Sequence, residues 1–142
     1  MSQETLQLRL ANKDDLPAFL ELTEELFNNT VYSTFSSFDT EHVSDRFLAS
    51  LEADQSKLCT VVLVKGEAPV GLITMARTGF MNKEEMAVEV AFWIKPEHRT
   101  KKTIKMLLQA YFYWARKVGC KAAFVGKLKG KQAPEQYLVR RL

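Results

Sequence analysis

The 142-residue sequence contains only two cysteines, Cys59 and Cys120. Two cysteines are too few for a disulfide framework, and both lie among apolar residues. The two histidines, His42 and His98, have no cysteine partners at the spacing of a zinc site. We therefore expect no metal site and two ordinary thiols of a reducing compartment.

Long apolar runs are also missing. No run reaches the roughly 18 residues that a membrane-spanning helix requires. The opening MSQETLQLRL lacks the basic and apolar regions of a signal peptide, so we expect a cytoplasmic protein. Repeats, low-complexity tracts and a Gly-x-Ser-x-Gly motif are absent too, which leaves serine-hydrolase chemistry without support.

The composition is that of an ordinary globular protein, and the length predicts a single domain over residues 1–142. The charge, however, is divided unevenly along the chain. Up to Glu89 there are 7 Lys and Arg against 15 Asp and Glu, a net charge of −8, and from Val90 there are 13 against 2, a net charge of +11. A basic half favours an anionic ligand or a nucleic acid, and an acidic half could attract an amine. Two solvated charged faces are the alternative.

A strand, a basic turn, a long helix and a second strand are predicted over Ala87–Lys127. Even positions of Ala87–Ile94 are all apolar, which predicts a strand with one apolar face and Glu89 on the other face. A helical stripe follows at Ile104, Leu107, Leu108, Tyr111, Ala115 and Val118. Gly119 is placed to cap this helix, and Ala122–Leu128 is predicted as a strand parallel to the first.

The turn before this helix is rich in cations. Glu97 is the only acid near five basic residues, which are Lys95, Arg99, Lys101, Lys102 and Lys105. A helix N-terminus already carries partial positive charge and free N–H groups, so this cluster favours a bound anion such as phosphate. A solvated basic loop is the alternative reading.

The remaining segments predict a mixed α/β fold in the order β-α-α-β-β-β-α-β-α. The expected strands before Ala87 are Leu6–Leu10, Leu58–Val64 and Val70–Thr78, with a turn at Lys65–Pro69. The expected helices run from about Leu16 to Phe27, from Thr40 to Glu52, and from Glu135 to Leu142. Between the first two helices, a loop carries Tyr32, Phe35 and Phe38, which could wall an acceptor pocket or pack onto the core. Glu84 and Glu85 precede the Ala87 strand and could meet a cationic acceptor, although the sequence favours a solvated turn there.

The run from Glu89 to Arg99, followed by Thr100–Leu108 and Trp114–Gly119, resembles the core motif of the GNAT superfamily of N-acetyltransferases, in a branch often carried by bacteriophages. The resemblance implies a GNAT-like sheet with acetyl-CoA between the two parallel strands and its pyrophosphate on the turn. In the family's pattern Arg/Gln-x-x-Gly-x-Gly/Ala, Arg99 matches, while Lys102 and Ile104 stand at the glycine positions. The implied cofactor-binding residues are Phe92, Trp93, Ile94, Arg99, Thr100, Lys101, Lys102, Thr103 and Ile104.

The resemblance also implies catalytic residues. Glu89 stands where family members carry a carboxylate that takes the amine proton through water, and burial in an apolar strand is expected to raise its pKa. For the acid that protonates the leaving thiolate, Tyr137 is the candidate, on the expected C-terminal helix. Two terminal strands of the family would be missing. The edge of Ala122–Leu128 would then be free to pair with a second copy or a partner protein.

The sequence and the GNAT resemblance leave two alternative functions. The first is an acetyl-CoA-dependent N-acetyltransferase acting on an amine. The second is a GNAT-like protein that has lost catalysis and works as a binding or structural component, in a phage particle or on a host protein. Nucleic-acid binding ranks third, because aromatic residues are not interleaved with the basic run.

Overall fold

The computed structural model describes residues 5–79, 81, 83, 85–127 and 136–142. In this part of the chain, a six-stranded sheet runs in the order β1-β2-β3-β4-β5-β6. All neighbouring strands are antiparallel except β4 and β5, which are parallel. The strands are β1 Leu6–Leu10, β2 Leu58–Lys65, β3 Ala68–Thr78, β4 Met86–Ile94, β5 Ala122–Lys127 and β6 Gln136–Arg141.

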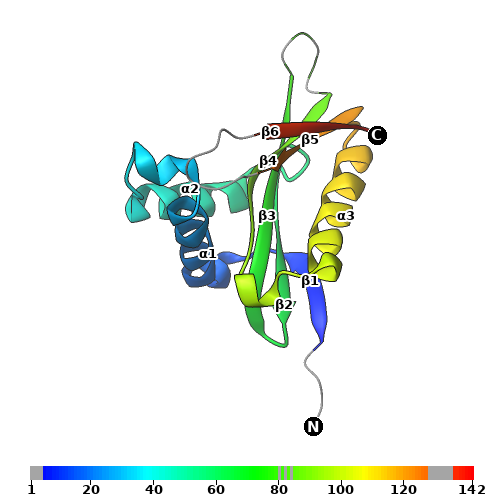
Figure 1. The fold of residues 1–142 in the computed structure, drawn as a ribbon. Helices are drawn as coiled ribbons and strands as arrows, with labels where there is room; N and C mark the ends of the chain where they lie inside the picture. Colours follow the sequence, from blue (N-terminus) through cyan, green and yellow to red (C-terminus); the bar gives the residue numbers. More distant parts are fainter. Residues whose placement is uncertain (1–4, 80, 82, 84, 128–135) are drawn as a thin grey trace.

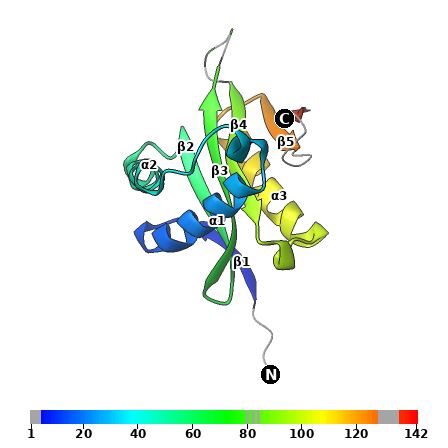
Figure 2. The same cartoon turned by 60° about the vertical axis from the view of Figure 1, so that its left-hand side comes forward.

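Helices cover both faces of the sheet. Helices α1 (Leu16–Asn28) and α2 (Thr40–Glu52) lie on one face, and α3 (Lys101–Lys117) lies on the other (Figure 1). Figure 2 shows the same layers with α1 turned toward the viewer. Each face has its own apolar core, one centred on Tyr111 of α3 and one centred on Phe47 of α2. The mixed α/β sheet predicted from the sequence is confirmed.

The helices follow the predicted stripes closely. In α3 the buried residues include Leu107, Tyr111 and Ala115, and Gly119 ends the helix with a φ of +95° that an L side chain rarely adopts. Helix α2 has the predicted bounds and buries Phe47. Helix α1 buries Phe19, Leu22 and Thr23, and Leu22 is only 1% exposed.

The start of α1 is prepared by a capping box. The side chain of Asn12 accepts a hydrogen bond from the N–H of Asp14, and the carboxylate of Asp15 accepts one from the N–H of Asn12. These bonds form a short 3-10 turn, Lys13–Asp15, which leads directly into α1. Arg9 of β1 completes the arrangement with two hydrogen bonds to Asp15, at 2.7 and 2.8 Å.

Strand β4 contains a β-bulge at Val90. Thr74 of β3 is opposite Ala91 and Met75 is opposite Glu89, so Val90 has no partner in the register. The bulge reverses the alternation of side chains, and Val90 is 58% exposed. The single apolar face predicted for the even positions of this strand is therefore wrong, because the extra residue shifts the later side chains to the opposite face.

The parallel strands β4 and β5 pair over only a short distance. Their register covers three residue pairs, from Met86↔Ala122 to Val88↔Phe124. Beyond Val88, β4 continues to Ile94 with no β5 partner in the part of the chain that the structure describes. The two strands therefore separate toward the start of α3, and this separation positions the candidate site.

The C-terminal segment is a strand and not the predicted helix. β6 pairs antiparallel with β5 over its whole length, from Ala122↔Arg141 to Lys127↔Gln136. A helix of eight residues is marginal on its own, whereas the free edge of β5 offers a row of N–H and C=O groups. Pairing with that edge determines the structure of the segment.

This strand also overturns two related predictions. One of the terminal strands that we expected to be missing is present, and it occupies the edge of Ala122–Leu128 that we expected to be open (Figure 1). The physical basis for a second copy or a partner protein at that edge is therefore removed. Leu128 itself lies outside the described residues.

Candidate functional site

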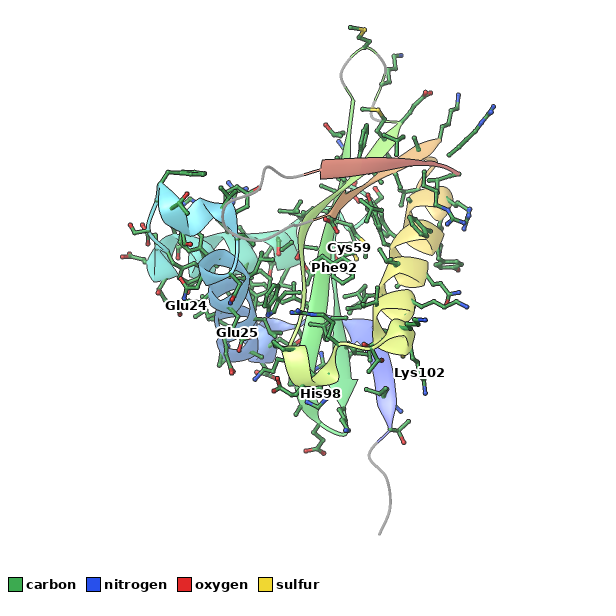
Figure 3. The ribbon with its side chains drawn as sticks, viewed as in Figure 1. Glu24, Glu25, Cys59, Phe92, His98 and Lys102 are labelled. Atoms are coloured by element: carbon green, nitrogen blue, oxygen red, sulfur yellow. The ribbon has the colours of Figure 1, made fainter. Side chains whose placement is uncertain are left out.

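A cavity of about 490 Å³ lies where β4 and β5 separate. We call it the β4–β5 cavity. Its lining comes from the end of α1, both strands, the turn before α3 and the first turn of α3. The lining residues are Asn29, Glu89, Phe92, Trp93, Ile94, Arg99, Ile104 and Gly126. Figure 3 shows Phe92 in the space between the sheet and α3.

Glu89 of β4 is hydrogen-bonded to β5, the other strand that lines this cavity. Its Oε1 accepts a hydrogen bond from the backbone N–H of Gly126 of β5, at 2.8 Å. The phenol of Tyr111 lies nearby and donates to the carbonyl of Phe124, at 2.8 Å. Burial raises the pKa of Tyr111, and the charge of Glu89 raises it further, so this phenol stays protonated at neutral pH.

Arg99 lines the cavity and is held in place by two contacts. Its Nη2 donates to the carbonyl of Ile94 at 2.7 Å, and its guanidinium lies over the Trp93 ring, 4.4 Å from the centroid. The indole N–H of Trp93 donates in turn to Glu25 of α1, at 2.9 Å. Glu25 thus fixes the ring against which Arg99 packs.

The first turn of α3 is capped by its own side chains. The hydroxyl of Thr100 accepts from the N–H of Thr103, and the carbonyl of Thr100 accepts from the N–H of Ile104. The Thr103 hydroxyl bonds the carbonyl of His98 and lies buried. The side chains of Lys101 and Lys102 are exposed on this turn.

The basic turn also has an acidic partner that the sequence did not reveal. Lys95 forms an ion pair with Glu21 of α1 at 2.7 Å, and this pair raises the pKa of Lys95. Glu97 is therefore not the only acid near the cationic cluster. Arg99, Lys101, Lys102 and Lys105 are the cations left to meet an anion at this turn.

The family model described as "Acetyltransferase (GNAT) family" matches residues 19–136, which is most of the chain. The protein belongs to the GNAT acetyltransferase family. Among curated proteins, the search found no match.

Solved structures of GNAT proteins share the fold at low sequence identity. An aminoglycoside N-acetyltransferase, AAC(6')-Iy, in complex with CoA is 16% identical with a TM-score of 0.70, over 84% of this chain and 75% of that one. The putative acetyltransferase yncA from Salmonella typhimurium, with its cofactor acetyl-CoA, is 17% identical with a TM-score of 0.69, over 86% and 69%. The paia N-acetyltransferase from Thermoplasma acidophilum, in complex with coenzyme A, is 19% identical with a TM-score of 0.64, over 87% and 80%.

The structure brings together six of the residues predicted for the GNAT site. Of the predicted set, the β4–β5 cavity is lined by Glu89, Phe92, Trp93, Ile94, Arg99 and Ile104. Thr100, Lys101, Lys102 and Thr103 lie beyond its lining, on the turn into α3. Tyr137 is on β6, where its register partner is Gly126, and not on a helix.

Several residues in or near the β4–β5 cavity were not found from the sequence. Gly126 was missed, although a glycine inside a strand is a known sign of close approach. Asn29 and Glu25 reach the site through the packing of α1 against β4, for which the sequence carries no local signal. Glu84 lies outside the described residues, and Glu85 pairs with Lys121 at 3.5 Å.

A second cavity, of about 750 Å³, lies on the opposite face of the sheet under α1 and α2. We call it the helix-side cavity. Tyr32 and Phe38 of the aromatic loop between α1 and α2 line it, whereas Phe35 is 70% exposed and does not line it. The loop forms a short 3-10 turn, Val31–Thr34, in which the Tyr32 and Phe35 rings meet edge to face at 6.0 Å.

The other expectations concern metals, membranes and thiols. Within the described residues, no group of His, Cys, Asp and Glu is arranged to hold a metal ion. No helix there has the length and apolarity to cross a membrane. Cys59 and Cys120 are both buried free thiols, and burial raises the pKa of each.

Proposed function

We propose that the protein is an N-acetyltransferase that transfers an acetyl group from acetyl-CoA to an amine. The observation that carries this proposal is the β4–β5 cavity, in which the Glu89 carboxylate and the Arg99 guanidinium line one space. A carboxylate can remove a proton from an amine, and a guanidinium can bind the phosphates of the cosubstrate. The two groups together suit acetyl transfer from acetyl-CoA to an amine.

The residues present fit acetyl-CoA. Its long arm combines apolar segments with amide groups, and the cavity offers apolar side chains from Phe92, Ile94 and Ile104. Beyond Val88, the β4 edge that faces β5 has no strand partner in the described residues, so its backbone groups can bond the arm. Arg99 and the exposed Lys101 and Lys102 would hold the phosphates.

Ile104 replaces the glycine of the family's usual turn. Its side chain forms part of the cavity wall, and about 490 Å³ remains beside it. The backbone N–H of Ile104 is used within α3, and so is that of Thr103. We therefore assign most of the phosphate binding to the side chains of Arg99, Lys101 and Lys102, with the N-terminal end of α3 adding a favourable partial charge.

When bound, acetyl-CoA supplies an acetyl group activated as a thioester. Glu89 is proposed to take the proton of the amine through water, and its bond to Gly126 orients the carboxylate for that task. The backbone N–H groups of Phe92–Ile94 are proposed to hold the carbonyl oxygen. Tyr137, opposite Gly126 on β6, is proposed to supply the proton that the leaving thiolate accepts.

We also propose a branch of the GNAT family and a cellular location for this protein. The basic residue Lys102 at the first glycine position of the turn supports the phage-type branch of the family, and with it a protein made in the host cytoplasm.

An enzyme assay tests the proposal. The protein is incubated with acetyl-CoA and a panel of primary amines, and free CoA thiol and acetylated amine are both measured. The buried Cys59 and Cys120 give a low background with a thiol reagent. We expect transfer that Arg99→Glu abolishes without unfolding the domain. Absence of any acetylated amine, with a folded protein and saturating acetyl-CoA, contradicts the proposal.

A further inference from the structure

The helix-side cavity has a floor of polar side chains. Thr60 of β2, Thr74 of β3 and Ala91 of β4 are register partners, so they form one row across the sheet. The hydroxyls of Thr60 and Thr74 are 2.8 Å apart and 5% and 6% exposed. One hydroxyl donates to the other, so the second keeps its own O–H hydrogen, for which no partner is seen within the described residues. The hydroxyl oxygens also keep lone pairs, so the row can accept a hydrogen bond from a ligand N–H and leave the lone pair of that nitrogen free.

The walls of this cavity are mainly apolar. They include side chains from α1, the aromatic loop, α2 and β2, namely Phe19, Leu26, Phe27, Phe38, Val43, Phe47 and Leu58. Phe27 and Phe38 also pack on each other at 5.8 Å. A volume of about 750 Å³ with such walls is that of a small-molecule site.

Charge is scarce and balanced in the lining. Asp39 is its only carboxylate among the described residues, and Oδ1 of that carboxylate already caps α2 through the N–H of His42. Arg46 contributes one positive charge. Glu21 and Glu25 of α1 are engaged by Lys95, which directly follows β4, and by Trp93 of β4. The cavity therefore lacks the several carboxylates that a polycation would require.

Neighbouring residues of β4, at its bulge, line the two cavities. Glu89 lines the β4–β5 cavity, whereas the next two residues, Val90 and Ala91, line the helix-side cavity. The row that ends at Ala91 therefore leads from Thr60 and Thr74 to the strand that separates the two spaces. The row therefore reaches β4 two residues from Glu89, the proposed base.

We infer that the acceptor is a small primary amine with a single apolar body, of the arylalkylamine or alkylamine class, and not a polycation. This inference rests on the proposed function. The apolar body lies among Phe27, Phe38 and Val43, and the amine lies at the Thr74 end of the row. In the transfer, the lone pair of the neutral amine forms the new N–C bond while the C–S bond breaks with its electrons on sulfur. The proton lost by nitrogen ends on that sulfur, giving an amide and a free thiol.

A matched pair of aromatic substitutions tests the inference. Phe38 lines the cavity and Phe35, three residues earlier on the same loop, does not. With 2-phenylethylamine as the probe, we expect Phe38→Ala to raise KM by roughly tenfold or more and Phe35→Ala to leave it within about twofold. Wild-type protein should acetylate 2-phenylethylamine and hexylamine with a kcat/KM at least about tenfold above that for spermidine or kanamycin.

A second variant tests the floor of the cavity. The double substitution Thr60→Val with Thr74→Val removes both hydroxyls together and leaves neither unpaired, so the fold should tolerate it. We expect an increase of about tenfold in KM for 2-phenylethylamine with an unchanged thermal melt. Melting curves of Phe38→Ala and of the double variant show whether each is folded. If one of these variants is unfolded, the other variant still tests whether the helix-side cavity binds the acceptor. The amine panel on wild-type protein still tests the acceptor class.

The outcomes separate this inference from the proposed function. Preferential acetylation of spermidine or kanamycin overturns the acceptor class and leaves the acetyltransferase in place. Equal effects of Phe38→Ala and Phe35→Ala, or an unchanged KM in the double variant, remove the helix-side cavity as the acceptor site. Failure of the proposed function is seen separately, as no binding of acetyl-CoA measured without any amine.

Discussion

The carboxylate of Glu89 accepts a hydrogen bond from the backbone N–H of Gly126, at 2.8 Å, across the gap between β4 and β5. The two strands are no longer paired at this level, because their register ends at Val88↔Phe124. Glu89 therefore has two possible tasks. It can hold the two strands at a fixed distance, and it can act as the base of the proposed transfer.

A substitution of Glu89 by glutamine separates these tasks. The amide oxygen of glutamine can still accept from Gly126, but it cannot take a proton. We expect Glu89→Gln to fold and bind acetyl-CoA normally, while kcat for acetyl transfer falls by roughly 10²–10⁴-fold. An unchanged kcat at neutral and at high pH would remove Glu89 from the mechanism. Glu89→Ala, which loses the strand contact as well, serves as the structural reference.

Two glutamates on α1 provide a matched test of how Arg99 is positioned. Glu25 bonds the indole of Trp93 beneath Arg99, whereas Glu21, one turn earlier, pairs with Lys95. We expect Glu25→Ala to raise KM for acetyl-CoA by about three- to tenfold with little change in kcat, and Glu25→Gln to restore it. Glu21→Ala should leave KM within about twofold. An equal loss in the two alanine variants would show that Glu25 has only a general electrostatic effect.

Much of this site was predictable because its signals are local. The alternation over Ala87–Ile94 and the stripe that includes Leu107 and Tyr111 depend only on the sequence of each element, and they predicted β4 and α3. The resemblance of the segment from Glu89 to Gly119 to the GNAT core motif then implied a site between β4 and β5. Six predicted residues do line one cavity there.

The features that were not predicted from the sequence depend on contacts between segments that are distant in the chain. Nothing local marks Val90 as a bulge, because the extra residue is defined only by its pairing with Thr74 and Met75 of β3. The bond from Trp93 to Glu25 joins residues 68 positions apart. The C-terminal segment was wrongly predicted as a helix because the free edge of β5, and not the propensity of the segment, determines its conformation.

The Arg9–Asp15 pair predicts how stability depends on pH. Hydrogen bonds from Arg9 are the main cause of the lowered pKa of Asp15, and the side chain of Arg9 is 39% exposed. A carboxyl group whose pKa is lower in the folded state than in the unfolded state stabilises the fold. The stabilisation is complete above the unfolded pKa of about 3.9, and it disappears as the pH falls through the pKa of the folded state. We expect Asp15→Asn to lower the free energy of unfolding by about 1–2 kcal/mol at pH 7, discounted for solvent screening of Arg9.

Urea unfolding at neutral and acid pH checks this prediction. The difference in unfolding free energy between wild type and Asp15→Asn should shrink as the pH is lowered below about 4. A difference that stays constant down to the acid limit would mean that the capping bond to Asn12 matters and the charge of Asp15 does not.

Strand β6 predicts slow hydrogen exchange along β5. The amides of Ala122–Val125 that join the β5–β6 ladder are satisfied by β6 in a single chain. We expect them to be protected well above the rates of the urea-unfolded protein. Fast exchange at these amides would contradict the pairing and return β5 to the open edge that the sequence suggested.

The central claim is that this protein binds acetyl-CoA through the β4–β5 cavity and the cationic turn at Arg99. Isothermal calorimetry with acetyl-CoA tests it most directly, with Lys117→Glu as a charge-reversal control at the other end of α3. We predict binding by the wild type and by Lys117→Glu that weakens as salt is raised, and no measurable binding by folded Arg99→Glu. No heat of binding to the folded wild type at millimolar acetyl-CoA, or equal binding by Arg99→Glu, would contradict the account.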